Sequence, residues 1–333
     1  MKGYKYMAKV TSIGGQALLE GIMMRGPEKT AMAVRHTSGE IIIEEFETKG
    51  KDRSKFFKLP FIRGLFNMYD SLSFGYKCLM RSAELSGLEE EEEKQKKEKK
   101  AKKNKDPEKE SKVFEKVLMP IATVLAIIIG LGLFMYLPTK VFEWIANASP
   151  AISGMVLADG SHPYSYYLIK AAISGVLRII IFIGYVWVTS LLKDIKRTYM
   201  YHGAEHKTIF CYEAGLPLTV ENVRKQKRLH PRCGTSFLIL TLIVGIVVGM
   251  FIHIDNTVLY TAAKLITFPI VIGVGYELIK LAGRKNNLLT RVISAPGMWL
   301  QKITTREPDD GMIECAIKAM ELAIPKDGES DQW

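Results

Sequence analysis

The sequence predicts a mainly α-helical polytopic membrane protein with four transmembrane helices, a small cytosolic α+β region and a cytosolic metal-binding loop. Three observations lead to this prediction. Hydrophobic residues make up 48% of the 333 residues. Four apolar runs are each long enough to cross a bilayer, which takes roughly 20 residues. The basic residues gather in alternate segments between these runs, as they do in membrane proteins.

The net charge of +11 suits either an anionic membrane surface or a nucleic acid. No RNA- or DNA-binding motif is visible, so we expect no nucleic-acid partner and take the lipid bilayer as the partner. The N-terminus shows no basic region followed by an apolar stretch and a cleavage site, so no removable signal peptide is expected.

Residues 1–88 are expected to form the cytosolic α+β region. Two extended apolar runs, Ala31–His36 and Ile41–Phe46, flank the turn residues Thr37–Gly39 and predict a β-hairpin. After Pro60, apolar residues recur at every third or fourth position and predict an amphipathic helix.

The stretch GGQALLEGIMMRGP, which precedes that hairpin, contains Glu20 and Arg25 between two glycine-containing turns. One interpretation is a tight hairpin packed within the small region. The other is a loop or strand that presents Glu20 and Arg25 to a cytosolic site. The stretch matches neither a dinucleotide-binding nor a phosphate-binding loop.

Residues 89–112 form a charged low-complexity run, expected to be a solvated helix or a disordered linker without chemistry of its own. The membrane core is expected at 113–285, and a cytosolic C-terminal tail follows at 286–333, with an amphipathic helix that starts at Pro308 and Asp309. The four predicted spans cover residues 117–137, 167–192, 235–254 and 259–282.

The loops between the spans set the orientation, because Lys and Arg stay on the cytoplasmic side. Residues 193–234 carry nine basic residues, whereas residues 138–166 carry only Lys140 and residues 255–258 carry none. Both termini and the 193–234 loop are therefore expected in the cytosol. All four cysteines fall on that side, where disulfides are disfavoured; they are Cys78, Cys211, Cys233 and Cys315.

The 193–234 loop contains YHGAEHK, in which His202, Glu205 and His206 have the order H-x-x-E-H. On an α-helix, residues four apart lie on one face, so the two imidazoles can bind one metal ion while Glu205 reaches the same region. This is the inverted zincin order, in which the glutamate acts as general base toward water. We expect zinc or another divalent metal; the alternative is a polar cluster on a helix surface.

The third metal ligand has several candidates. The stretch RLHPRCG offers His230 and Cys233, Glu213 lies two turns beyond the motif, and Glu277 lies in the fourth predicted span. A set of two histidines with His230 and Cys233 would be closed and structural, whereas three protein ligands would leave a position for water. Arg178, in the middle of the second span, is expected to bind lipid or a carbonyl or to line a polar cavity.

The motifs GGQALLEGIMMRGP, YHGAEHKTIFCYE, HPRCGTSF and APGMWLQKITTREPDDGMIECAI resemble those of the YqhQ-like family of bacterial multi-pass membrane proteins. The resemblance covers nearly the whole chain apart from residues 89–112. It implies a bacterial inner-membrane protein that is a predicted metal-dependent enzyme. It points to His202, Glu205, His206, His230 and Cys233 as the site.

The favoured function is a metal-dependent hydrolase that acts at the cytosolic membrane face on a peptide or lipid-linked substrate. Its expected partner is a membrane-associated substrate or protein. The alternative is a non-enzymatic membrane scaffold or regulator whose loops are held by a structural metal or a polar cluster. A transporter is the third hypothesis, and only Arg178 and Glu277 support it.

Overall fold

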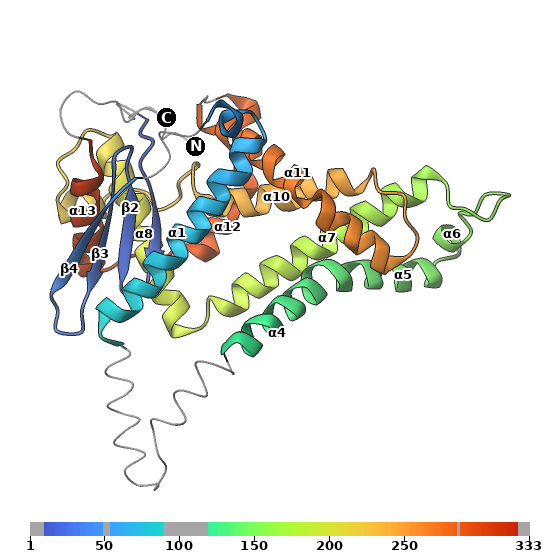
Figure 1. The fold of residues 1–333 in the computed structure, drawn as a ribbon, viewed down its shortest axis with the longest axis horizontal. Helices are drawn as coiled ribbons and strands as arrows, with labels where there is room; N and C mark the ends of the chain where they lie inside the picture. Colours follow the sequence, from blue (N-terminus) through green and yellow to red (C-terminus); the bar gives the residue numbers. More distant parts are fainter. Residues whose placement is uncertain (1–9, 49–53, 89–118, 285–286, 326–333) are drawn as a thin grey trace, which may run out of the picture. The chain divides into compact units, whose positions relative to one another are not determined.

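The computed structural model of the chain describes residues 10–48, 54–88, 119–284 and 287–325 (Figure 1). It divides into two compact units. The sheet unit comprises Met1–Glu92, Val186–Leu238 and Tyr276–Trp333, and the helical unit comprises Glu93–Tyr185 and Ile239–Gly275. The predicted linker at 89–112 lies outside the described residues.

The sheet unit is built on a four-stranded antiparallel sheet in which each strand pairs with the next along the chain. Its strands are β1 (Gly14–Leu18), β2 (Gly21–Arg25), β3 (Lys29–Arg35) and β4 (Ile41–Glu47). Strands β3 and β4 confirm the predicted hairpin. The stretch GGQALLEGIMMRGP forms a second hairpin, in which Leu18 pairs with Gly21 and Glu20 occupies the turn at φ 50°.

Helices cover both faces of this sheet. Because side chains alternate along a strand, Ile22 and Met24 of β2 pack toward α8 (Lys193–Glu213) and α13 (Asp310–Ala323). Met23 packs on the opposite face with α1 (Ile62–Ser86). Each of these buried side chains contributes about 1.5–3 kcal/mol of transfer free energy. Burial on both faces explains why Ile22, Met23 and Met24 follow one another in β2 without a polar residue between them.

The predicted amphipathic helices of this unit are confirmed. Helix α1 begins at Ile62, shortly after Pro60, and ends before Gly87, whose φ of 72° suits glycine at a helix C-terminus. Helix α13 begins after Asp309, whose side chain accepts a hydrogen bond from the Met312 amide at 2.9 Å. The unit also contains η1 (Lys55–Lys58), α9 (Val220–Arg224) and α12 (Leu288–Thr304).

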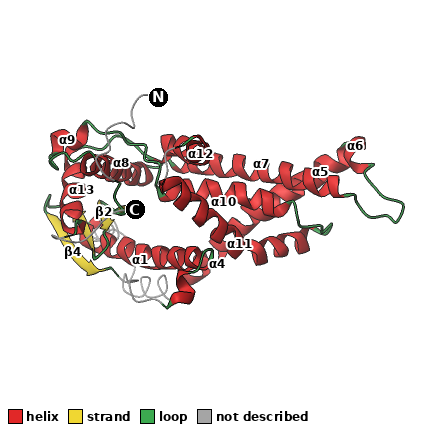
Figure 2. Ribbon diagram, turned by 90° about the horizontal axis from the view of Figure 1, so that it is seen from above, coloured by secondary structure: helices red, strands yellow, loops and turns green. Residues whose placement is uncertain are grey.

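Among the described residues, helices make up the helical unit and the segments that lead into it, and the strands belong to the small sheet (Figure 2). These helices are α4 (Met119–Leu131), the π-helical turn η3 (Gly132–Tyr136), α5 (Leu137–Ala148), α6 (Pro150–Ser153), α7 (Tyr164–Thr189), α10 (Gly234–Gly249) and α11 (Thr257–Arg284). Three helical stretches are long and apolar enough to cross a membrane: Ile121–Ala148, Tyr164–Thr189 and Thr257–Gly283.

The predicted count of four long spans is not reproduced among the described residues. The run predicted at 235–254 forms α10, which ends at Gly249 and has 16 residues. At 1.5 Å per residue such a helix is about 24 Å long, less than the hydrocarbon thickness of about 30 Å. The apolar pattern could not show where the helix would end.

The first span is longer than predicted. It was expected to end at 137, with an outer loop from 138 to 166, but α5 continues it to Ala148 and carries Trp144. Pro138 does not end the helix, because it lies in the first turn of α5, directly after η3. A π-helical turn changes the hydrogen-bond spacing and so accommodates the missing N–H group of proline.

Candidate metal centre

Helix α8 carries the H-x-x-E-H motif through the interior of the sheet unit. Every residue from Tyr201 to Ile209 is buried, because the sheet and α13 pack against the helix. The strand-like segment after α12 also passes close to it: a Cβ at Gly203 would lie 2.0 Å from the Arg306 carbonyl oxygen. Only glycine fits there, so Gly203 in YHGAEH allows the segment after α12 to pass close to helix α8.

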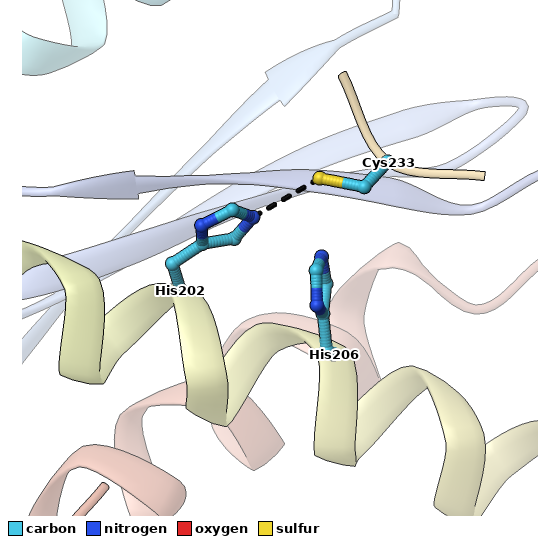
Figure 3. A group of neighbouring side chains, drawn as sticks. All are labelled: His202, His206 and Cys233. Atoms are coloured by element: carbon cyan, nitrogen blue, oxygen red, sulfur yellow. Dashed lines mark hydrogen bonds between the residues drawn. The ribbon is translucent and has the colours of Figure 1, made fainter. Parts of the chain in front are cut away.

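Three side chains converge at one point of this helix (Figure 3). His202 and His206 lie one turn apart with their ring centroids 4.4 Å from each other. Cys233, which directly precedes α10, brings its sulfur to 3.1 Å from His202 Nε2. One donor atom from each of the three residues lies within 4.8 Å of the others. The structure therefore selects Cys233 to join the two histidines.

Backbone carbonyls orient both imidazoles. His202 Nδ1 is 2.8 Å from the Thr304 carbonyl oxygen, and His206 Nδ1 is 2.5 Å from the Arg228 carbonyl oxygen. A carbonyl can only accept, so each Nδ1 carries a proton and each Nε2 is directed at the common point. This is the usual outer-shell arrangement of metal-binding histidines. His206 Nε2 is buried and has no hydrogen-bond partner in the described part of the chain.

Electrostatics favour the thiolate at Cys233. Burial alone would raise the pKa of this thiol, but His202 and His206 outweigh burial and hold it well below its usual value. The position before a helix N-terminus acts in the same direction. Burial would likewise lower the pKa of His202, but the Cys233 thiolate and Glu205 outweigh it and raise that pKa to about 9. The pair is thus an imidazolium and a thiolate when no metal displaces the proton.

The donor set fits a transition metal. Tetrahedral zinc with bonds of about 2.0 Å to nitrogen and 2.3 Å to sulfur separates these two atoms by roughly 3.5 Å, and the His202 nitrogen and Cys233 sulfur are 3.1 Å apart. Two imidazoles and one thiolate suit zinc and related divalent metals rather than calcium or magnesium. The partnerless His206 Nε2 is the atom that such an ion would satisfy.

Glu205 lies against strand β1 at the edge of this cluster. A Cβ at Gly15 would lie 2.9 Å from the Glu205 carboxyl carbon and 2.8 Å from the Met23 carbonyl oxygen, so only glycine leaves room for the carboxyl group. The Gly15 amide donates a hydrogen bond to that carboxylate. Burial raises the pKa of Glu205 even though the two histidines lower it. A raised pKa brings a carboxylate closer to the range useful for a general base.

A cavity of about 340 Å³ adjoins the cluster. Glu205, His206 and Cys233 form part of its wall, together with the chain from Thr11 to Gln16. Arg25 and Arg232 also line it. The cavity therefore opens beside the three convergent donor atoms.

His230 belongs to a second, adjacent cluster. Its Nε2 is 3.5 Å from Glu213 Oε2, and its ring centroid is 5.6 Å from that of His206. Burial lowers the pKa of His230 to about 4, so the ring is neutral. Burial alone would raise the pKa of Glu213, but His230, Arg232 and the Thr11 amide outweigh it and lower that pKa. Glu213 is thus a buried carboxylate, ion-paired with Arg232.

The remaining predicted site residues have other partners. Glu277 accepts two hydrogen bonds from Arg63. Glu20 pairs with Arg197 at the surface of the sheet unit. Arg178 belongs to the helical unit, where its Nε donates to the Phe134 carbonyl at 2.7 Å.

Sequence reasoning did not find several supporting groups. Gln301 holds His230 in place through two hydrogen bonds to its backbone, at 2.7 and 2.8 Å. The carbonyls of Thr304 and Arg228 carry no side-chain signal, because any residue has a carbonyl. Gly15 and Arg232 could have been found, since both lie inside the quoted motifs.

Comparison with known proteins agrees with the family expected from the motifs. The sequence model of a family described as "Protein of unknown function (DUF1385)" matches residues 59–326. The chain is 31% identical over 322 residues to "Uncharacterized protein YqhQ" of Bacillus subtilis (strain 168), covering 96% of this chain and 94% of that protein. No solved structure matches. Neither description names an enzymatic activity, so that expectation stays a prediction.

Proposed function

The chain belongs to the DUF1385 family, and from this premise and the metal-centre geometry we propose that it is a metal-dependent hydrolase. It acts at the cytosolic membrane face on a peptide or lipid-linked substrate. The observation that carries the proposal is the convergence of His202 Nε2, His206 Nε2 and the Cys233 sulfur beside a cavity that Glu205 also lines. Three protein donors leave a fourth tetrahedral position, as catalytic zinc sites do.

The residues divide the work as follows. His202, His206 and Cys233 hold the metal, and backbone carbonyls keep both rings in the required orientation. A bound zinc or similar ion lowers the pKa of water toward 7 and polarises a carbonyl or phosphoryl oxygen. The Glu205 carboxylate, held by the Gly15 amide, accepts a proton from a water in the cavity while the water oxygen adds to the substrate carbonyl carbon or phosphorus. When the bond to the leaving group breaks, Glu205 passes that proton to the leaving group.

The proposal includes a membrane arrangement. Four helices cross the bacterial inner membrane, with α10 as the short fourth one, and both termini and α8 lie in the cytosol. The distribution of basic residues supports this orientation, because residues 193–234 carry nine and residues 138–166 carry one. The hydrolase site then faces the cytosol at the start of α10.

The first experiment measures metal in the full chain, purified in mild detergent with an affinity tag that does not bind metal. Mass spectrometry should find about one divalent metal ion per chain, as expected for a three-ligand site. His202→Ala and Cys233→Ala should lose the metal, whereas His36→Ala, which lies in the turn between β3 and β4, should retain it. A wild-type protein that neither carries zinc nor takes up added zinc would overturn the proposal.

A second experiment separates catalysis from metal binding. Glu205→Gln removes the base but none of the three metal donors, so the metal content should stay unchanged. Membranes from cells that express wild type or Glu205→Gln are then compared by mass spectrometry of peptides and lipids. Cleavage products should be present with the wild type and absent with the variant. Identical profiles, with metal bound in both proteins, would argue against a hydrolase.

The second candidate is a structural metal in a membrane scaffold or regulator. It is favoured by the burial of the three side chains, which are between 1% and 8% exposed, since structural zinc is usually shielded from water. This function predicts that His202→Ala unfolds the sheet unit, whereas Glu205→Gln leaves every cellular readout unchanged. Limited proteolysis of the two variants distinguishes the candidates.

A further inference from the structure

The helical unit contains three buried cations that are independent of the metal centre. Lys170 and Arg178 lie on α7, and Lys264 lies on α11. Their exposed fractions are 1%, 7% and 7%. A charge within an apolar helical bundle is costly unless it is paired, and such residues commonly mark a binding or transport site.

Lys170 has a complete set of partners. Its ammonium donates to the carbonyl oxygens of Ile254 and Asp255, at 2.9 and 3.1 Å. It also lies 4.6 Å from the centre of the Tyr260 ring, close enough for a cation–π interaction. These carbonyls directly precede α11, so Lys170 joins the beginning of α11 to α7.

Arg178 is only partly satisfied. Its Nε donates to the Phe134 carbonyl at 2.7 Å. In a regular helix this carbonyl would accept from the N–H of residue 138, but that residue is proline and has no N–H group. Its Nη2 is buried and has no hydrogen-bond partner among the described residues. A guanidinium nitrogen without an acceptor in such a place is expensive, so this atom points to a ligand.

Lys264 faces the same ring from α11. Its Nζ lies 4.1 Å from the centre of the Tyr260 ring, so two ammonium groups share one aromatic side chain. Among the residues that the structure describes, neither Arg178 nor Lys264 has a carboxylate within ion-pair distance. Asp255, an acidic residue shortly before α11, accepts a hydrogen bond from Tyr167 at 3.0 Å.

Helix α10 forms the third side of this site. A Cβ at Gly249 would lie 3.4 Å from the Tyr260 hydroxyl and 3.5 Å from Lys264 Cε. The hydroxyl and the lysine side chain are therefore neighbours on the same side of α11. Any side chain larger than that of glycine at this point of α10 would come into contact with both groups.

We propose that Arg178, Lys264 and Tyr260 form a binding site for an oxyanion of the phosphate type. The guanidinium offers the unpaired Nη2, which matches the fork-like geometry of phosphate recognition. The ammonium supplies a second positive charge and the phenol supplies a hydroxyl donor. One bound oxyanion neutralises the excess positive charge and satisfies the partnerless nitrogen.

The depth of the site leaves two sources for that oxyanion. At 1.5 Å per residue, Lys170 and Lys264 lie about 9–11 Å from the starts of their helices, and Arg178 lies about 21 Å from the start of α7. Arg178 is nevertheless close enough to Tyr260 and to Lys264 to interact electrostatically with both. A free phosphate that enters the bundle and a lipid phosphate drawn inward share the same chemistry.

The test uses the full chain and two ligand arms. In the first, delipidated protein in neutral detergent is titrated with sodium phosphate at constant ionic strength, and thermal unfolding is followed. In the second, the protein is placed in phosphatidylcholine nanodiscs with or without phosphatidic acid. The site predicts a rise in Tm with one of these ligands. The arm that responds identifies the source.

Variants make the test specific. Arg178→Gln and Lys264→Met should each lower the apparent affinity about tenfold or more. Lys264→Met should also raise the ligand-free Tm, because it removes a buried charge, so a folding defect is not expected to obscure the result. Lys140→Met is the control, since Lys140 is exposed and pairs with Glu143. The proposal is overturned if neither ligand stabilises the wild type, or if both site variants respond as the wild type does.

Discussion

Glu213→Gln tests whether the cluster behind the metal centre supports the fold. Glu213 is fully buried, and the side chain of its partner Arg232 is only 7% exposed. The substitution keeps the shape but removes the negative charge, so Arg232 is left as a buried, uncompensated cation. Breaking a buried ion pair in this way costs about 3–5 kcal/mol.

This free energy converts into a measurable shift. The three segments of the sheet unit total about 200 residues, and for a domain of that size each kcal/mol lowers Tm by roughly 2–4 °C. The expected decrease is therefore about 6–20 °C in a thermal unfolding experiment in detergent. Glu221→Gln is the matched control, because Glu221 pairs with Lys225 on the surface and should show no measurable change.

The pH dependence gives a second check. The pKa of Glu213 is lowered in the folded protein because Arg232, His230 and the Thr11 amide outweigh burial. Its contribution to stability is therefore present above the ordinary carboxyl pKa and is lost as the pH falls through the folded value. The difference in Tm between wild type and Glu213→Gln should shrink in acid. A decrease no larger than that of Glu221→Gln at neutral pH would refute the reasoning.

Three further predictions concern the metal centre. Gly15→Ala should displace the Glu205 carboxyl, with which the new Cβ clashes, and leave the metal content unchanged while cleavage is lost. In metal-free protein at pH 7, iodoacetamide should modify Cys233, whose pKa is lowered, much faster than Cys78, whose pKa is raised by burial to about 11. Added zinc should protect Cys233 from modification, and peptide mapping measures both effects. Glu277→Gln should leave the metal content at its wild-type value, because Glu277 binds Arg63.

The sequence was sufficient for features that depend on local patterns. The hairpin of β3 and β4 follows from alternating apolar residues around a turn, and α13 follows from the capping residue Asp309. The spacing of His202 and His206 follows from helical periodicity alone. The three long apolar helices also follow from the sequence, because runs of this length with so few charged residues are typical of membrane-spanning helices.

The limits of the apolar runs were harder to predict. Helix α10 ends at Gly249, earlier than its apolar sequence indicated, and the first span continues through Pro138 to Ala148. Both outcomes depend on backbone hydrogen bonding at single residues. Hydropathy averages over a window and does not contain that information.

The sequence by itself determined the family, the long apolar helices and the two histidines on one face of a helix. Only the tertiary structure decided between the candidates for the third donor. It brings Cys233 to 3.1 Å from His202, turns His230 toward Glu213 and engages Glu277 with Arg63. The physical reason is that periodicity fixes which residues share a helix face, whereas contacts between distant segments depend on how the sheet, α8 and the start of α10 pack together.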